Sequence, residues 1–323
     1  MAILIPFCGF AEKVLFRAKP HEDLPVPWFT GPIFASSGIP VPENHYNIEP
    51  YLFATANTAI YREDWKARKI ETLWNINSQT LLTVGINSWL DFQITPSFFY
   101  NFRKRASSWA LGDLPVQFDI QLYKNHPVNY STNWLTAVKL ILKEIFPLGK
   151  YRNFSPEKML TEEGGLGSFQ TAVALVWGNL IHIQGIHFMT ARLSFQYTVP
   201  SPVHVKGFNS FGGGHGTNGR IYPGQNFQFD LGLEYNLSQQ WALAIDVIGT
   251  LESRVRFKGK PGIDLQGRPA RGGYGASAQY SLAPAIEYNW SGNLGVIGGV
   301  WFTVAGRNAY KFCSAVFALN YYK

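Results

Sequence analysis

Nine ionisable residues on the polar sides of alternating segments are the first candidates for chemistry in this chain. Carboxylate, ammonium and guanidinium groups can pair with each other or can line a water-filled path for a polar solute. Both signs are present, so the side chains could pair across an interior and close it, or could leave a selective, partly hydrated passage. The sequence leaves both interpretations open for Asp91, Asp119, Lys139, Lys143, Arg192, Asp230, Glu234, Asp246 and Glu287.

Lipid hydrolysis is a second chemistry that the residue types would allow. Ser168 and Ser194 are possible nucleophiles, and His182 and His187 are possible bases. Such a site needs the serine, the base and an orienting group within hydrogen-bond reach of each other. No Gly-x-Ser-x-Gly or similar signature marks either serine. We therefore expect no enzyme, and an outer-membrane lipid hydrolase is the least favoured alternative.

Metal, nucleotide and nucleic-acid sites have little support. The glycine-rich stretch 211–220 lacks the Gly-Lys-Ser/Thr ending of a phosphate loop, and His215 has only His204 near it in sequence. The two cysteines, Cys8 and Cys313, make neither a disulfide framework nor a metal motif. The chain also has no basic helix or RNA-binding motif. We expect no cofactor, no bound metal and no nucleic-acid partner.

One hairpin shows which elements would position the charged residues. The segment 225–237 has an apolar residue at every second position from Phe227 to Leu237, and a short connection, 238–240, leads to a second alternating segment that starts at Trp241. Side chains on a strand point to alternate faces, so each segment would have one apolar and one polar face. Long strands joined by a short turn, with aromatic residues at the ends of the apolar face, are typical of outer-membrane hairpins.

The whole chain predicts an all-β fold, a closed antiparallel transmembrane β-barrel of about 12 strands. A lipid-facing Lys or Arg at mid-membrane costs about 2–4 kcal/mol, so the nine charged residues should point into the lumen. In segment 133–146 the apolar residues also have helical spacing, which keeps an amphipathic helix open there. The predicted strands are 45–56, 70–86, 89–102, 112–124, 133–146, 167–178, 181–199, 225–237, 241–256, 274–289, 293–305 and 310–322.

The predicted connections alternate between short and long, as periplasmic turns and outer loops do in such barrels. The exceptions are 125–132, of medium length, and 306–309, which is short. The short turns are Asn87-Ser88, Asn179-Leu180, 238–240 and 290–292, and the long gaps are 57–69, 103–111, 147–166, 200–224 and 257–273.

Composition agrees with a membrane barrel. Aromatic residues make up 15% of the 323 residues and charged residues 15%, whereas about 25% charged residues is usual in soluble domains. No uninterrupted apolar run reaches the length of roughly 18 residues that a transmembrane helix needs. Strands that alternate between lipid and a polar lumen leave no such run.

The sequence predicts that the chain has three consecutive parts. Residues 1–11 resemble the end of a signal peptide, with Gly9-Phe10-Ala11 as a small-x-small cleavage pattern. Residues 12–44 are rich in proline and form either an extended periplasmic segment or a plug in the barrel mouth, with Trp28, Phe29 and Phe34 inside. The barrel itself is expected over residues 45–323.

Charge is divided unevenly between the predicted outer regions and the rest. The five predicted long gaps, together with residues 253–256 and 306–309, contain 19 Lys and Arg and 6 Asp and Glu. Their net charge is therefore +13, in a chain whose net charge is +7. These cations would pair with phosphates of lipopolysaccharide or attract anionic solutes to the mouth. The alternating final strand, which ends near Tyr321, is similar to the signal by which the barrel assembly machinery recognises its substrates.

Several stretches resemble one known family. They are Trp28-Phe-Thr-Gly-Pro-Ile, Asn47-Ile-Glu-Pro-Tyr-Leu-Phe, Asp91-Phe-Gln-Ile-Thr-Pro, Gln279-Tyr-Ser-Leu-Ala-Pro-Ala-Ile-Glu-Tyr and Gly298-Gly-Val-Trp-Phe-Thr-Val-Ala-Gly-Arg-Asn. They are similar to outer-membrane proteins grouped as "MetA-pathway of phenol degradation", over about residues 28–322. The resemblance implies a bacterial outer-membrane barrel for passage of small solutes, with aromatic or hydrophobic compounds as candidates. A structural or adhesin-type barrel without flux is the alternative.

Overall fold

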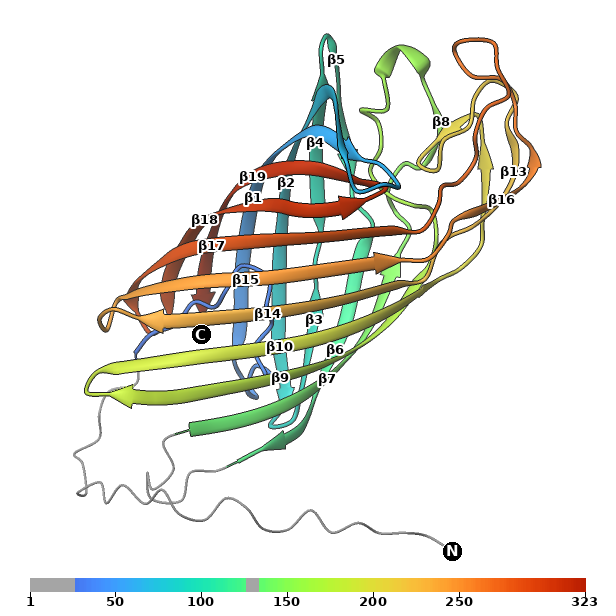
Figure 1. Ribbon diagram of the computed structural model, residues 1–323. Coiled ribbons are helices and arrows are strands. Elements are labelled where there is room, and N and C mark those ends of the chain that lie inside the picture. The colour runs from blue at the N-terminus through green and yellow to red at the C-terminus, as the bar shows by residue number, and fades with distance from the viewer. Residues whose placement is uncertain (1–26, 126–133) are drawn as a thin grey trace, which may run out of the picture.

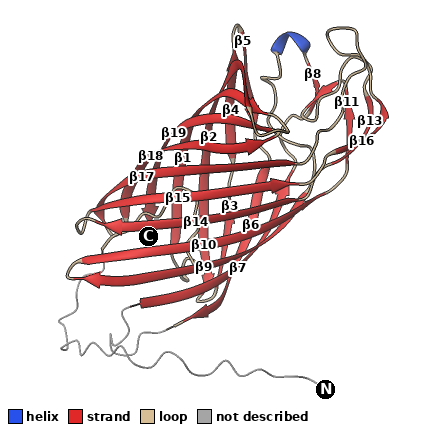
Figure 2. Ribbon diagram, in the orientation of Figure 1, coloured by secondary structure: helices blue, strands red, loops and turns tan. Residues whose placement is uncertain are grey.

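The computed structural model describes residues 27–125 and 134–323, and the predicted signal peptide at 1–11 lies outside them. Almost all regular structure in this part of the chain is β (Figure 2), and the helical element is one 3-10 turn, η2 (Pro156–Lys158). No helix among the described residues is long and apolar enough to cross a membrane.

A single antiparallel sheet closes into a barrel, because β1 pairs with β2 on one side and with β19 on the other (Figure 1). Tyr51 shows the closure, since it lies opposite Gln79 of β2 and opposite Ala318 of β19. The predicted fold class, a closed antiparallel barrel with 12 strands, is confirmed. Its strands are β1 (Tyr46–Tyr61), β2 (Ala67–Asn87), β3 (Leu90–Ile94) with β4 (Ser97–Arg103), β5 (Ala106–Leu111) with β6 (Leu114–Lys124), β7 (Trp134–Phe146), β9 (Gln170–Gln184), β10 (His187–Pro200), β14 (Asn226–Asn236), β15 (Trp241–Glu252), β17 (Ser277–Ser291), β18 (Leu294–Arg307) and β19 (Ala309–Tyr322).

Two of the twelve barrel strands are interrupted side by side. Pro96 separates β3 from β4 because proline has no N–H to give to the ladder, and residues 112–113 separate β5 from β6. The wall stays hydrogen-bonded across both breaks: Thr80 N donates to Pro96 O at 3.1 Å, and Gly112 N donates to Ser97 O at 2.8 Å. The breaks therefore interrupt the strands without opening the ladder at these points.

Long connections gather at one end of the barrel and form what we call the outer cap, residues 147–169, 201–225 and 253–276 (Figure 1). A small apolar core holds the cap together, with Val205 and Ile221 fully buried and packed with Val203, Phe211 and Val255. The cap contains two small sheets, β12 (Phe208–Asn209) with β8 (Arg152–Phe154), and β11 (Val203–Lys206), β13 (Asn218–Tyr222) and β16 (Arg256–Lys260).

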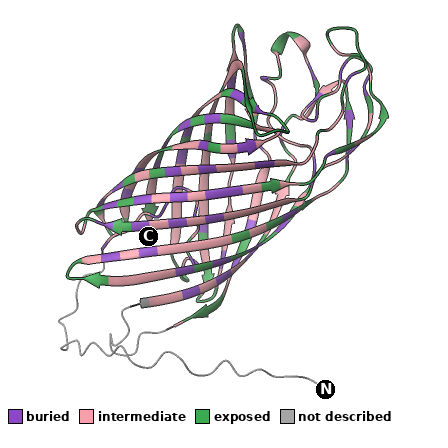
Figure 3. Ribbon diagram, in the orientation of Figure 1, coloured by how far each residue is buried: buried purple, intermediate pink, exposed green. Residues whose placement is uncertain are grey.

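Burial alternates along the barrel strands, as Figure 3 shows. On β9, for example, Val173, Leu175 and Trp177 are about half exposed, whereas Ala172, Ala174 and Val176 are buried. Exposed apolar side chains of this kind continue around the barrel, and exposed tryptophans lie near the turns, among them Trp89, Trp241 and Trp290. An apolar exterior with aromatic residues at its ends is the surface that a bilayer requires.

Several sequence-based boundaries were wrong. The turn expected at Asn179-Leu180 lies at Gly185-Ile186, where Gly185 has a φ of 59° that favours a tight turn. By contrast, the strand predicted for 133–146 is confirmed as β7, which pairs with β6 and β9 along its length, and the helix that the sequence left open there is wrong. Two predicted long gaps are largely strand: within 57–69 the loop is only 62–66, and most of 103–111 is β5, in a hairpin with β4.

Candidate functional site

All nine ionisable residues predicted to face the lumen lie on strands of the barrel wall and avoid its apolar exterior. Seven are at least 98% buried, and Arg192 and Lys143 are partly buried. Their hydrogen-bond partners are each other, polar neighbours on the wall, and the chain that precedes β1. The structure thus brings them into one interior, while their role in a solute path stays a prediction.

One side of the wall carries a compensated ion pair. Lys139 on β7 lies 2.6 Å from Asp119 on β6, and each side chain is only 3% exposed. Gln117 Nε2 also donates to Asp119 Oδ1 at 2.8 Å. A buried pair of this kind is retained because removal of either partner leaves an uncompensated charge. We call β6 and β7 the paired wall.

The side of the barrel interior opposite the paired wall has four carboxylates and few cations. Asp230 and Glu234 on β14, Asp246 on β15 and Glu287 on β17 are all nearly completely buried. The cation that contacts them is Arg192, whose Nη2 lies 2.9 Å from Glu234 Oε2. One carboxylate oxygen each of Asp230, Glu234 and Glu287 has no hydrogen-bond partner among the described residues. We call β14, β15 and β17 the acidic wall.

Residues 27–45, here called the N-terminal segment, donate backbone N–H hydrogen bonds to carboxylates of the acidic wall. Thr30 N donates to Glu287 Oε2 at 2.8 Å, and Ala35 N and Phe34 N donate to Asp246 at 3.0 and 3.3 Å. Carboxylates that accept backbone N–H bonds form charge-assisted hydrogen bonds, which are about twice as strong as neutral ones. The acidic wall therefore holds the segment inside the barrel.

The N-terminal segment continues around the lumen to the paired wall. Ser36 Oγ accepts a hydrogen bond from Lys139 Nζ at 3.1 Å, and Gly38 O accepts one from Gln121 Nε2 at 3.0 Å. Val41 N then donates to Asp91 Oδ2 on β3 at 2.6 Å. The segment thus passes β17, β15, β7, β6 and β3 in turn, so it follows the inner wall as an arc that narrows the lumen.

Two glycines in the wall make room for this arc. A Cβ atom on Gly232 of β14 would lie 2.3 Å from Ala35 Cβ, and one on Gly85 of β2 would lie 1.8 Å from Pro42 O. Real Cβ atoms essentially never come so close, so neither position can carry a side chain while the segment stays in place. Glycine inside a strand often marks such an approach of another backbone.

An aromatic cluster occupies the third side of the lumen, on β1, β18 and β19. Phe34 of the N-terminal segment packs against Trp301 and Phe53, with ring centroids 4.7 and 6.0 Å apart, and Trp301 also contacts Phe312 at 4.3 Å. Trp301 Nε1 donates to Ser281 Oγ at 2.9 Å. Phe34 therefore joins two surfaces, since its ring contacts the aromatic side and its N–H contacts Asp246.

Sequence reasoning missed this cluster and one lumenal carboxylate. Glu49 on β1 accepts hydrogen bonds from Tyr51 Oη at 3.1 Å and from Asn320 Nδ2 at 3.1 Å. Tyr51 and Phe53 lie on the same inner face as Glu49, so the inner face of this strand is not polar throughout. The available signal was the proline-rich segment with its aromatic residues, which needs an apolar partner inside the barrel.

The residues considered for hydrolysis do not form a triad in the described part of the chain. His182 on β9 hydrogen-bonds Gly185 O, and His187 on β10 hydrogen-bonds Asn236 O, so the two histidines lie on separate strands. Ser168 Oγ donates to backbone carbonyls, at 2.6 Å to Ser201 O. No group of three metal-ligating residues occurs in the described ranges, and Cys313 is a free, exposed cysteine.

Two carboxylates of the outer cap have shifted pKa values. Burial raises the pKa of Glu163 to about 7, although a hydrogen bond from Ser210 opposes the shift. Backbone hydrogen bonds from Arg268 and Gln266, together with the Arg268 guanidinium, lower the pKa of Asp264. The Asp264 contacts close the loop between 264 and 268, with Arg268 NH2 at 3.2 Å from Asp264 Oδ2.

Comparison with known proteins identifies the fold. No protein-family model matches the chain, and no curated protein sequence matches it. Among solved structures, the chain is similar to the COG4313 outer membrane channel from Pseudomonas putida F1, with a TM-score of 0.68 and 12% identity, over 90% of this chain and all of that one. At this identity the likeness shows the fold, which is the outer-membrane barrel that the sequence resemblance implies.

Other similar structures are more distant. The β domain of the Bordetella autotransporter BrkA has a TM-score of 0.45 and 9% identity, over 86% of this chain and 99% of that one. The toluene transporter TodX from Pseudomonas putida has a TM-score of 0.36 and 10% identity, over 86% and 89% of the two chains. At these scores neither carries an argument about function.

Proposed function

We propose that this chain is a channel of the bacterial outer membrane for small solutes. The observation that carries the proposal is a closed barrel whose exterior is apolar and whose interior has both a charged wall and an aromatic side. A charged inner face suits a path for water and polar solutes, because ionised side chains need water or hydrogen-bonding groups around them. The similar outer-membrane channel of Pseudomonas putida supports the proposal.

The lumen suits solutes that combine an apolar part with a polar group. Phe53 and Trp301 form an aromatic surface that Phe34 covers while the N-terminal segment is in place, and Arg192 and the carboxylates of the acidic wall supply hydrogen-bonding groups. Aromatic or other compact hydrophobic compounds are the candidates that fit these two surfaces. Passage without chemical conversion is part of the proposal, so we infer transport and not catalysis.

The N-terminal segment would regulate the width of the path. Its chain continues into β1, and hydrogen bonds to Glu287, Asp246 and Asp91 bind it to the rest of the wall. A substitution that crowds the segment should therefore widen the path. Gly232→Ala places a methyl group against Ala35, where a Cβ has only 2.3 Å of space.

Single-channel recording on planar bilayers tests both ideas. We expect measurable conductance for the unaltered chain and a several-fold increase for Gly232→Ala. The matched control is Gly298→Ala on β18, because a Cβ there meets nothing within 4 Å. Folding of each variant is checked by the mobility of unboiled against boiled protein in detergent. Silent bilayers for all three folded proteins would contradict the channel and favour a structural or adhesin-type barrel.

The membrane environment and its partners belong to the same proposal. Lysines and arginines of the outer cap, such as Lys206, Arg220 and Lys258, would pair with phosphates of lipopolysaccharide. Barrel assembly machinery would recognise β19, whose outward residues include Phe317 and Tyr321. Outer-membrane lipid contacts the apolar exterior. Fractionation of the expressing bacterium tests the localisation, since the chain should appear with outer-membrane proteins.

A further inference from the structure

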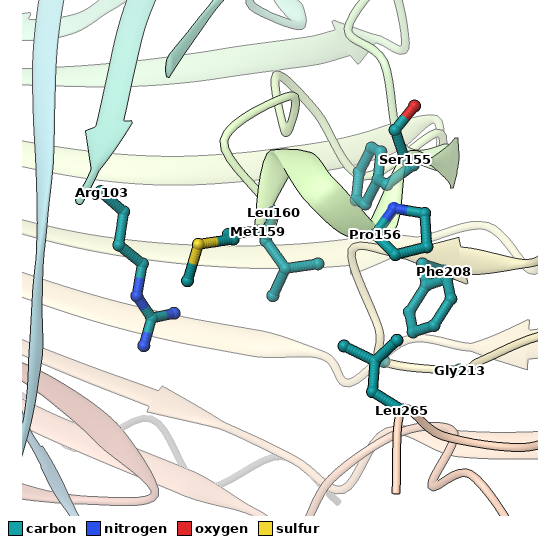
Figure 4. Close-up of a pocket in the computed structure, with 10 residues that line it drawn as sticks. Arg103, Ser155, Pro156, Met159, Leu160, Phe208, Gly213 and Leu265 are labelled. Carbon is teal, nitrogen blue, oxygen red and sulfur yellow. The ribbon is translucent and has the colours of Figure 1, made fainter. Parts of the chain in front are cut away.

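A cavity of about 270 Å³ lies in the outer cap, away from the lumenal residues described above. Figure 4 shows its walls, which come from separate parts of the chain: the end of β4, β8, the turn after η2, β12 and the loop that follows β16. The residues that define its chemistry are Arg103, Phe154, Met159, Leu160, Phe208 and Leu265.

Strand pairing and hydrogen bonds hold the residues that line this cavity in place. Phe208 lies opposite Phe154 in the small sheet of β12 and β8. Asn101 on β4 donates to Thr161 O at 3.0 Å and to Glu163 O at 2.9 Å, which fixes the turn after η2 to the barrel. These contacts place the two phenylalanines and the turn on a common support.

Backbone strain is concentrated at the same wall. Met159 and Leu160 have φ angles of 52° and 70°, in the left-handed region that non-glycine residues rarely adopt. Such positions cost of the order of 1–3 kcal/mol each and cluster at ligand sites. Here the strained turn directs two apolar side chains, Met159 and Leu160, to one cavity.

The lining combines an apolar surface with one guanidinium. Leu160 and Leu265 remain 41% and 61% exposed, although they lie in a part of the chain outside the lipid belt. Arg103 is the one charged residue of the lining, and its hydrogen bond within the described chain is from Nε to Glu71 at 3.3 Å. Lys104 also pairs with Glu71, at 3.1 Å, so these three residues carry a net positive charge.

We propose that the cavity binds a small single-ring aromatic carboxylate. The ring would lie among Phe154, Phe208 and Leu265, and the carboxylate would accept hydrogen bonds from the two terminal nitrogens of Arg103, which make no hydrogen bond to the described residues. Benzene fits an apolar cavity of roughly 150 Å³, so the volume of about 270 Å³ admits a ring with one substituent. An arginine fork is the group best suited to a carboxylate.

This proposal rests on the proposed function, because binding in the cap would hold a solute at the outer mouth before it enters the lumen. The basic outer cap would also attract an anionic solute to this site, since Lys206, Arg220 and the cations of 253–273 raise the local concentration of anions. The site differs from the lumen in that it lies in water and can be tested without measuring passage.

The test is equilibrium binding of benzoate to the full chain in detergent, followed by NMR of the ligand. Benzyl alcohol, which lacks the charge, and acetate, which lacks the ring, are the comparison probes. We expect saturable binding of benzoate and about tenfold weaker binding of each comparison probe. Benzoate that does not saturate, or acetate that binds as well as benzoate, would overturn the site. Benzyl alcohol that binds equally well would overturn the role of Arg103.

Two variants locate the binding. Arg103→Gln should weaken benzoate binding about tenfold, whereas Arg105→Gln, at the exposed β4–β5 turn beside it, should have no effect. Leu265→Asp should weaken binding by repulsion of the carboxylate, whereas Leu148→Asp, at a position 54% exposed that does not line the cavity, should not. Equal binding by Arg103→Gln and the unaltered chain contradicts the proposal. Loss of benzoate binding in a chain that still conducts separates failure of this site from failure of the channel.

Discussion

The N-terminal segment and the outer cap are both irregular chain packed against the same barrel, but different forces hold them. The segment is held by hydrogen bonds between its backbone and charged side chains of the wall, as between Ala35 N and Asp246 at 3.0 Å. The outer cap is held by its own small sheets and by a buried apolar core that includes Val205 and Ile221.

This difference predicts different sensitivities. Charge-assisted hydrogen bonds in a buried setting respond to removal of a charge, whereas an apolar core responds to loss of volume. Charge substitutions in the lumen should therefore release the segment and leave the cap intact. Volume substitutions in the cap should loosen the cap and leave the lumen intact. Four experiments test this division, from the largest expected effect to the smallest.

Lys139→Met should have the largest effect. It leaves Asp119 buried without its partner at 2.6 Å and removes the hydrogen bond to Ser36. We expect the free energy of unfolding to fall by about 3–5 kcal/mol, as for other broken buried pairs. Urea unfolding in lipid vesicles, followed by tryptophan fluorescence, measures the loss.

Two controls accompany Lys139→Met. Lys311→Met, at an exposed position on β19, should change the free energy of unfolding by less than about 0.5 kcal/mol. Adding Asp119→Leu to Lys139→Met should recover most of the loss, because no buried charge then remains. A loss below about 1 kcal/mol for Lys139→Met alone would show that the paired wall is hydrated and not sealed by the segment.

Ile221→Ala tests the other side of the comparison. Ile221 is fully buried in the core of the outer cap, and removing its side-chain volume should destabilise the cap locally by about 2–4 kcal/mol. Hydrogen exchange of cap amides should become faster, while conductance stays unchanged. Ile263→Ala, where the side chain is 53% exposed, is the control and should leave exchange unaffected. Altered conductance in Ile221→Ala would mean that the cap and the lumen are coupled.

Asp246→Asn and Asp230→Asn form a matched pair on the acidic wall. Asp246 accepts hydrogen bonds from Phe34 N at Oδ2 and from Ala35 N at Oδ1, so replacing one oxygen by an amide nitrogen should weaken the hold on the segment by about 1–2 kcal/mol and raise conductance. Asp230 is equally buried, but the described segment makes no hydrogen bond to it. Its substitution should leave conductance unchanged and should not reduce stability. Equal conductance changes in the two variants would show that charge alone, and not the segment, sets the flux.

Glu163→Gln concerns the pH dependence of the outer cap. Burial raises the pKa of Glu163 from 4.5 to about 7, so the folded cap favours the protonated form. The stabilisation is fully present below pH 4.5 and is lost as the pH rises through about 7. Protection of cap amides from hydrogen exchange, corrected for intrinsic rates, should fall over this range by about 1–2 kcal/mol.

The control for that prediction is a neighbouring carboxylate. Glu163→Gln should remove most of the change in amide protection with pH. Glu157→Gln, at an exposed position of η2, should retain that change. A slope that persists in Glu163→Gln would assign the pH dependence to another group of the cap.

Much of the fold could be predicted because alternation is local. Segment 225–237 already separated Asp230 and Glu234 from the apolar side of their strand, and the structure places both on the inner face of β14. The sequence predicts a strand for 133–146 but leaves a helix open there, because Val138, Ile141 and Leu142 have helical spacing. Pairing of β7 with β6 and β9 confirms the strand. An error arose at the turn at Gly185, which was missed because the apolar run passes through Leu180 without interruption.

The candidate site was predictable only in its residue types. The nine charged residues could be assigned to one face, but their partners could not, because Lys139 with Ser36 and Asp246 with Ala35 join positions 103 and 211 residues apart. Gly85 and Gly232 were visible as glycines inside strands. Their purpose became clear only from the distances to Pro42 and Ala35.

Alternation in the sequence was enough to show that most strands have one apolar and one polar face, and hence that the chain encloses a largely polar interior within an apolar exterior. Which of the described charges pair with each other, and the course of the proline-rich segment along the inner wall, could be seen only in the folded chain. The physical reason is that side-chain alternation is set by the geometry of single residues in a strand, whereas hydrogen bonds across the lumen depend on how the sheet closes.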